Sequence, residues 1–145
     1  MKRLDEFAPF ELAELACAFA KVQRVEEPLF SRISHEALCR IDTFAPVELA
    51  DLAWAFACGK LDDPELFRAI AGQARPCISQ FSTRNLSRLA WALATMRQDF
   101  PDVVDAIGYE AIPRRKEFDP RDLDNLQWAF ETLRRGKMLH RLLME

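Results

Sequence analysis

Residues 44–57 read FAPVELADLAWAFA, and this stretch decides the fold because the chain repeats it. Residues 7–20 read FAPFELAELACAFA, residues 81–94 read FSTRNLSRLAWALA, and residues 118–131 read FDPRDLDNLQWAFE. The copies begin at Phe7, Phe44, Phe81 and Phe118, so each lies 37 residues after the last without any insertion. A fixed period of about 20–50 residues is typical of solenoids and related arrays. The sequence therefore predicts four repeats, over residues 7–43, 44–80, 81–117 and 118–145.

Each copy opens with the signals of a helix start. Proline falls at the first helical position in three copies, where its missing N–H costs nothing. The predicted N-cap residues are Ala8, Ala45, Ser82 and Asp119. The third helical position carries an acid in three copies, at Glu11, Glu48 and Asp122, which suits the positive end of a helix. The repeated Phe before the cap and the Leu five residues later have the spacing of a hydrophobic staple.

The first helix of each repeat is predicted to be apolar on two sides. In the second copy it should run about 13 residues, from Pro46 to Cys58, with a buried stripe at Leu49, Leu52, Ala53 and Phe56. Ala50, Trp54 and Ala57 form a second apolar stripe, so the helix needs two neighbours. We expect Trp54, Trp91 and Trp128 to be largely buried between successive first helices, and a base-stacking platform is the alternative.

A second helix completes each repeat. It is predicted after the turn signals Asp62-Asp63-Pro64 and Asp99-Phe100-Pro101, and Pro76 and Pro113 should close or kink it. The predicted fold is therefore all-α: a right-handed α-solenoid of four helix-turn-helix repeats of 37 residues, forming one domain over residues 1–145.

Composition gives little material for catalysis or for a metal site. The chain has two His and four Gly, and no Ser/His/Asp set, paired catalytic carboxylates or phosphate-cradling glycine loop stands out. The four cysteines form no C-x-x-C pair, and His35 with Cys39 supplies only two ligands where zinc needs at least three. We therefore expect no enzyme activity, no cofactor and no metal. No apolar run approaches the roughly 18 residues of a membrane span, so we expect no membrane insertion.

Charge differs between the two halves of the chain. The net charge is −3 overall, which argues against bulk attraction to a polyanion. Residues 1–80 hold 9 basic and 13 acidic residues, whereas residues 81–145 hold 11 basic and 10 acidic residues. If the chain binds RNA, the third and fourth repeats are the expected place.

The motif Phe-x-Pro-x-x-Leu-x-x-Leu-Ala-Trp-Ala-Phe-Ala resembles the first helix of octotricopeptide repeats and of their 37-residue relatives, the heptatricopeptide repeats. The resemblance covers essentially the whole chain, and the Leu-Ala-Trp-Ala segments at 52–55 and 89–92 are its most specific part. It implies a non-catalytic protein that binds single-stranded RNA in organelle RNA processing, stability or translation. It places the protein in a mitochondrion or plastid, although the first residues, MKRLDE, show no targeting segment. The stretch at 62–67 departs from the Pro-rich form common in algal members.

Candidate binding residues come from the face of the first helix that we expect to be exposed. In the second copy this face holds positions 47, 48, 51, 55 and 58. The candidates on it are Asp51, Arg84, Asn85, Arg88, Arg121 and Asn125. If each repeat reads one base, four repeats would read about four nucleotides. An idle solvent-exposed face is the alternative.

A basic cluster at Arg114, Arg115 and Lys116 is a further candidate for phosphate or for an acidic protein, and a solvated turn between repeats is its alternative. A different function also stays open. The short array and acidic first half suit a protein–protein scaffold, an accessory subunit of a ribosome or of a respiratory or photosynthetic complex.

Overall fold

The computed structural model describes residues 3–24 and 26–144 of the chain, and these residues form helices and no strand. The α-helices are α1 (Pro9–Lys21), α2 (Glu27–Cys39), α3 (Pro46–Cys58), α4 (Pro64–Ala74), α5 (Thr83–Thr95), α6 (Pro101–Ala111), α7 (Pro120–Thr132) and α8 (Gly136–Met144). Short 3-10 helices are η1 (Leu4–Glu6), η2 (Ile41–Thr43), η3 (Arg75–Gln80) and η4 (Ile112–Glu117). The predicted all-α class is confirmed.

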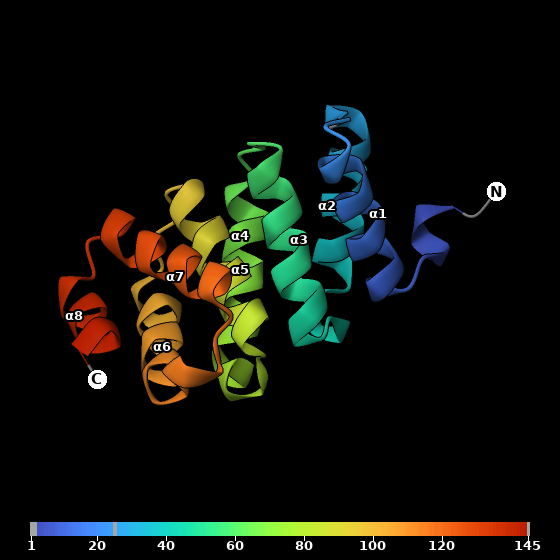
Figure 1. The fold of residues 1–145 in the computed structure, drawn as a ribbon. Helices are drawn as coiled ribbons and strands as arrows, with labels where there is room; N and C mark the ends of the chain where they lie inside the picture. Colours follow the sequence, from blue (N-terminus) through green and yellow to red (C-terminus); the bar gives the residue numbers. More distant parts are fainter. Residues whose placement is uncertain (1–2, 25, 145) are drawn as a thin grey trace.

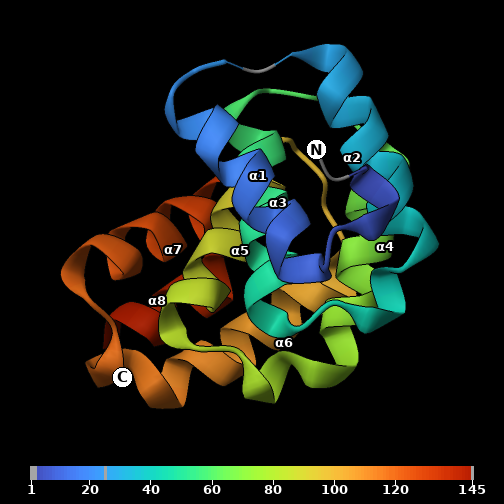
Figure 2. The ribbon, with the colours of Figure 1, turned by 90° about the vertical axis from the view of Figure 1, so that its right-hand side faces the viewer.

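The helices form two layers. We call α1, α3, α5 and α7 the A helices, and α2, α4, α6 and α8 the B helices. Each A helix packs extensively on the next one, and each also contacts its own B helix (Figures 1 and 2). One hydrophobic core runs between the layers, and its largest fully buried side chains include Phe30, Phe56, Phe67, Phe81 and Phe130. This packing is consistent with a helical repeat.

The A helices begin where the sequence predicts, and for the predicted reason. Each N-cap residue has extended or near-extended backbone, and three A helices have proline at the first position. The Glu11 carboxylate accepts the Ala8 N–H at 2.9 Å, and the Glu48 carboxylate accepts the Ala45 N–H at 3.1 Å. In the third A helix the Ser82 hydroxyl accepts the Asn85 N–H. Local side-chain chemistry therefore sets all these starts.

Asp122 departs from the predicted capping role. The cap of α7 is Asp119, whose carboxylate accepts the Arg121 N–H at 2.9 Å. The carboxylate of Asp122 makes no such bond within the described residues, because its side chain is one methylene shorter than that of glutamate. Its charge therefore acts on the helix end through the helix dipole alone and not through a capping hydrogen bond.

Every A helix ends on a left-handed residue that is not glycine. Gln23, Lys60, Arg97 and Arg134 have φ of 56°, 54°, 53° and 58°. After α3 the Lys60 N–H donates to the Ala57 carbonyl and the Leu61 N–H donates to the Phe56 carbonyl, both at 3.0 Å. These are the two bonds of a Schellman motif, which glycine usually closes because a Cβ is strained there.

Replacing Lys60 with glycine is therefore expected to stabilise the protein. The left-handed conformation costs a residue with a Cβ about 1–2 kcal/mol, and glycine avoids this cost. The greater freedom of glycine in the unfolded chain offsets part of the resulting stabilisation. We expect the free energy of unfolding to rise by about 0.5–1 kcal/mol in urea denaturation followed by circular dichroism. Lys60→Ala is the control, because it removes the side chain and keeps the Cβ. An equal gain from Lys60→Ala would contradict the explanation.

The exposed face of the A helices differs from the predicted one. Ala55 and Ala92, expected on that face, are fully buried. Trp54 and Trp91, expected to be buried between helices, are only partly buried, and Trp128 is 43% exposed. The prediction of a buried tryptophan column is therefore wrong for Trp128, whereas Trp54 and Trp91 pack against the core and stay partly open.

The reason is that an inner A helix is covered on both flanks as well as on its core side. The flank of α3 that carries Ala55 is closed, whereas the equivalent Ala18 is exposed in α1, the first A helix of the described residues. The other flank faces the next A helix, since the Ser87 hydroxyl on α5 donates to the Asp122 carbonyl on α7 at 2.7 Å. Only a narrow stripe stays open, and in α3 it consists of Val47, Asp51, Trp54 and Cys58.

Candidate functional site

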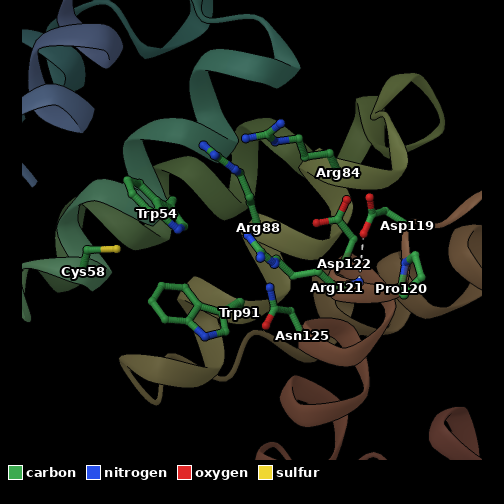
Figure 3. Close-up of a pocket in the computed structure, with 10 residues that line it drawn as sticks. All are labelled: Trp54, Cys58, Arg84, Arg88, Trp91, Asp119, Pro120, Arg121, Asp122 and Asn125. Carbon is green, nitrogen blue, oxygen red and sulfur yellow. Dashed lines mark hydrogen bonds between the residues drawn. The ribbon is translucent and has the colours of Figure 1, made fainter. Parts of the chain in front are cut away.

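A large hollow lies on this open stripe, between α3, α5 and α7. It has a volume of about 740 Å³ and is lined by Trp54, Cys58, Arg84, Arg88, Trp91, Asp119, Pro120, Arg121, Asp122 and Asn125 (Figure 3). We call it the central pocket. Of the predicted binding residues, it brings together Arg84, Arg88, Arg121 and Asn125.

Arg88 is held in place at one wall of the central pocket. Its Nη1 lies 2.7 Å from the Asp51 carboxylate on α3, and its guanidinium lies 4.8 Å from the centre of the Trp54 ring. The Arg88 and Asp51 side chains are 17% and 27% exposed, so the pair is shielded from much of the solvent. A cation stacked on an aromatic face and paired with an acid fixes the guanidinium, and it also fixes the Trp54 ring. Arg88 and Asp51 therefore join α5 to α3.

Arg84 and Arg121 supply positive charge that the fold does not use. They occupy the second position of α5 and of α7, and both are exposed. Within the described residues, neither guanidinium has a hydrogen-bond or salt-bridge partner. Figure 3 shows both side chains extending from the first turns of their helices toward the side of the pocket that holds Trp54 and Trp91. Two free guanidinium groups beside aromatic rings suit an anionic ligand with a planar part.

Two carboxylates limit where an anion can lie. Figure 3 shows Asp119 and Asp122 on the side of the pocket away from the tryptophans. Asp119 is engaged as the cap of α7, whereas Asp122 is not, so one free carboxylate opposes the two free arginines. An anion is therefore favoured on the tryptophan side and disfavoured at the start of α7.

A second hollow of about 490 Å³ continues toward α1. Its lining is mixed in charge: Glu14, Cys17, Ala18, Lys21, Val47, Asp51, Arg84, Asn85 and Arg88. The predicted candidates Asp51 and Asn85 lie here. Along the open stripe, the equivalent positions 10, 47, 84 and 121 are Phe, Val, Arg and Arg. The face therefore changes from apolar and acidic over α1 and α3 to basic over α5 and α7.

The thiols on this face are poor nucleophiles at neutral pH. Burial, and to a smaller extent the nearby Asp51 carboxylate, raise the pKa of Cys17 to about 11. Burial also raises the pKa of Cys58, against the opposing charge of Arg88. With raised pKa values both thiols stay protonated at neutral pH, and the thiolate is the reactive form. Cys17 is buried and packs in the core, whereas Cys58 is exposed on the open stripe. The Cys17 thiol donates to the Asp51 carbonyl at 3.4 Å. Cys17 occupies the repeat position at which the later repeats carry tryptophan.

The basic cluster between the third and fourth repeats is mostly engaged within the protein. Arg114 donates to the Phe81 carbonyl at 2.8 Å, just as Arg40 donates to the Phe7 carbonyl at 2.7 Å. Arg115 donates to the carbonyls of Leu142 and Leu143 at the end of α8. Lys116 is exposed. The cluster thus lies apart from the central pocket, and two of its three side chains join structural elements.

Trp54 and Trp91 are site residues for which the sequence favours burial in the core and leaves base stacking as the alternative. Small residues on both flanks of the tryptophan position indicate two close helix neighbours, and on sequence alone this signal also favours burial of the ring. Because neighbouring A helices cover both flanks, the tryptophan side chain lies at the one side of its helix that stays open.

The described part of the chain contains no group of three or more His, Cys, Asp or Glu residues that could hold a metal ion. Nor does any of its helices have the length and apolar character needed to cross a bilayer. Comparison with protein-family models and with curated proteins finds no match. The class of the protein therefore follows from its structure alone. It is an all-helical protein with repeat-like packing, and its layer of A helices carries a pocket lined by cationic and aromatic side chains.

Proposed function

We propose that the chain is a right-handed α-solenoid of four 37-residue repeats, of the octotricopeptide or heptatricopeptide kind, and that it binds single-stranded RNA. In this proposal it acts without catalysis in RNA processing, stability or translation in a mitochondrion or plastid. The observation that carries it is the central pocket, where two unpaired arginines face two partly exposed tryptophans. Proteins that hold single strands combine positive charge along the backbone with aromatic rings that stack on bases.

The test is a salt-dependent binding assay with short, end-labelled single-stranded RNA, read by fluorescence anisotropy. Arg84→Glu with Arg121→Glu should lower affinity at least about tenfold at about 50 mM salt, and should flatten the salt dependence. Both substitutions place an acid in the first turn of a helix, where it is favoured, so the fold should survive.

The matched control is Arg32→Glu with Arg68→Glu. It makes the same change in net charge at two exposed arginines of the B helices α2 and α4. We expect its affinity to stay within about twofold of the wild type, since a distant surface charge contributes little. Equal losses in both double variants, or no binding by the wild-type protein, would rule out RNA binding at the pocket.

A protein-docking role is the second candidate, and the first half of the same face favours it. Phe10 is 55% exposed and Val47 is 46% exposed, and Glu14 lies beside them on the open stripe. Exposed apolar side chains next to an acid suit a protein partner better than a phosphate backbone. Such a partner would be a subunit of an organellar ribonucleoprotein, respiratory or photosynthetic complex.

The check is affinity purification from organelles after nuclease treatment. Phe10→Asp with Val47→Asp should abolish recovery of any stoichiometric protein partner, because it places two charges on the apolar surface. Arg84→Glu with Arg121→Glu should leave that recovery intact. If the wild-type protein yields no stoichiometric partner once RNA is digested, the docking role is excluded.

A further inference from the structure

We infer that the central pocket holds one nucleotide of the bound strand, with its base stacked on Trp91 and its phosphate between Arg84 and Arg121. The inference rests on the proposed RNA binding and assigns this site its contacts. It differs from a model in which polar residues of each repeat recognise one base. Here the central contact is an aromatic ring, in a pocket that neighbouring repeats line together.

The two tryptophans of the pocket are not equivalent. One face of the Trp54 ring is covered by the Arg88 guanidinium at 4.8 Å, and Asp51 holds that guanidinium in turn. Trp91 has no ring or cation partner within the described residues, although it is partly packed against the core. A partly buried ring without a stacking partner still has a face to offer to a base. Trp91 is therefore the stacking platform, and Trp54 with Arg88 forms a fixed wall beside it.

Asn125 supplies a polar contact for the edge of the base. It lines the pocket next to Trp91, and its amide has no hydrogen-bond partner within the described residues (Figure 3). An asparagine amide presents a donor and an acceptor side by side, which is what the edge of a nucleobase requires. The pocket thus contains a stacking face, an edge contact and an anion contact within one volume of about 740 Å³.

The charges also set the direction in which the phosphate lies. The free arginines extend toward the tryptophan side, whereas the Asp119 and Asp122 carboxylates lie on the other side (Figure 3). A phosphate at the start of α7 would meet two acids, so the strand must pass on the side of Trp91. This arrangement brings base and phosphate of the same nucleotide to neighbouring walls.

The third tryptophan provides a matched control. Trp128 occupies the same position of α7 that Trp91 occupies in α5, and it is 43% exposed, but it does not line the central pocket. Stacking on Trp128 would need no contact with Arg84 or Arg121. If substitution of Trp91 weakens RNA binding and substitution of Trp128 does not, the binding is specific to this pocket and is not a general attraction of RNA to exposed aromatic rings.

The experiment measures the affinity of the full chain for two probes, an eight-nucleotide oligoadenylate and an abasic ribose-phosphate strand of the same length. Trp91→Leu keeps an apolar side chain against the core but lacks the aromatic face. It should weaken oligoadenylate binding about tenfold, as expected for one lost base stack, and leave binding of the abasic strand unchanged. Trp91→Phe should restore most of the affinity, and Trp128→Leu should have no effect. Urea denaturation of each variant shows whether it is folded.

The outcomes separate the inference from the proposed function. If the wild type binds neither probe, both fail. If Arg84→Glu with Arg121→Glu abolishes binding while Trp91→Leu has no effect, RNA binding stands and the stacking role is wrong. Equal losses from Trp91→Leu and Trp128→Leu, or an equal loss for both probes, would likewise overturn the nucleotide pocket. Should Trp91→Leu not fold, Trp91→Phe with Asn125→Ala must still weaken oligoadenylate binding more than binding of the abasic strand.

Discussion

Phe56→Ala is expected to lower the free energy of unfolding by about 3–5 kcal/mol, the range for truncating a buried phenylalanine. The Phe56 ring is 2% exposed and meets the Phe30 ring edge to face, with centroids 5.2 Å apart. The substitution removes apolar contacts, leaves a cavity between the A and B layers, and loses the aromatic pair, which contributes about 0.5–1.5 kcal/mol. Urea denaturation followed by circular dichroism gives the loss.

Phe10→Ala is the matched control for this substitution. It makes the same truncation on an A helix, but Phe10 is 55% exposed. Surface substitutions of this kind stay within about 0.5 kcal/mol. A similar loss for both variants would mean that the core does not lie between the layers.

The second large effect is expected from filling the space between A helices. Ala16, Ala53 and Ala90 occupy equivalent positions and are fully buried. Ala90→Leu forces three more heavy atoms into a closed interface, which costs about 3 kcal/mol because α5 and α7 must separate or side chains must leave their rotamers. The measurement is again the urea midpoint, with the slope of the transition checked for a change in the unfolding mode.

The chain contains its own control for this interface. The fourth repeat carries Gln127 at the equivalent position of α7, where it is only partly buried and no further A helix covers it in the described chain. Gln127→Leu should therefore change stability by less than about 0.5 kcal/mol. If Ala90→Leu is tolerated as well as Gln127→Leu, the close approach of A helices is not what stabilises the array.

Local features could be predicted from the sequence. Three A helices start with a proline and carry an acid at the third position, and α5 starts at the Ser82 cap, so these signals place the starts correctly. The ends of α4 and α6 likewise precede Pro76 and Pro113, as expected. Such features need no knowledge of the neighbours, because the interacting groups lie within one turn of helix.

Features that depend on neighbours could not be predicted in the same way. An apolar tryptophan at helical spacing indicates only that one side of the helix is apolar, and the second A-helix neighbour decides which side stays open. The partners of Arg88 and Arg114 lie 37 and 33 residues away in sequence. Of the candidate site residues, those on the open stripe were found from the pattern, whereas the roles of Trp54 and Trp91 required the packing.

The hydrogen bonds that join one repeat to the next determine how the free energy of unfolding is distributed along the chain. Those of Ser87, Arg88 and Arg135 span 35 to 37 residues, and each links a repeat to its immediate neighbour. In such a chain the free energy is close to a sum of terms for single repeats and for the junctions between them. The central pocket is built across two junctions, α3 with α5 and α5 with α7. If the proposed strand fills it, the binding energy is added to both junctions and should make the three repeats unfold more cooperatively.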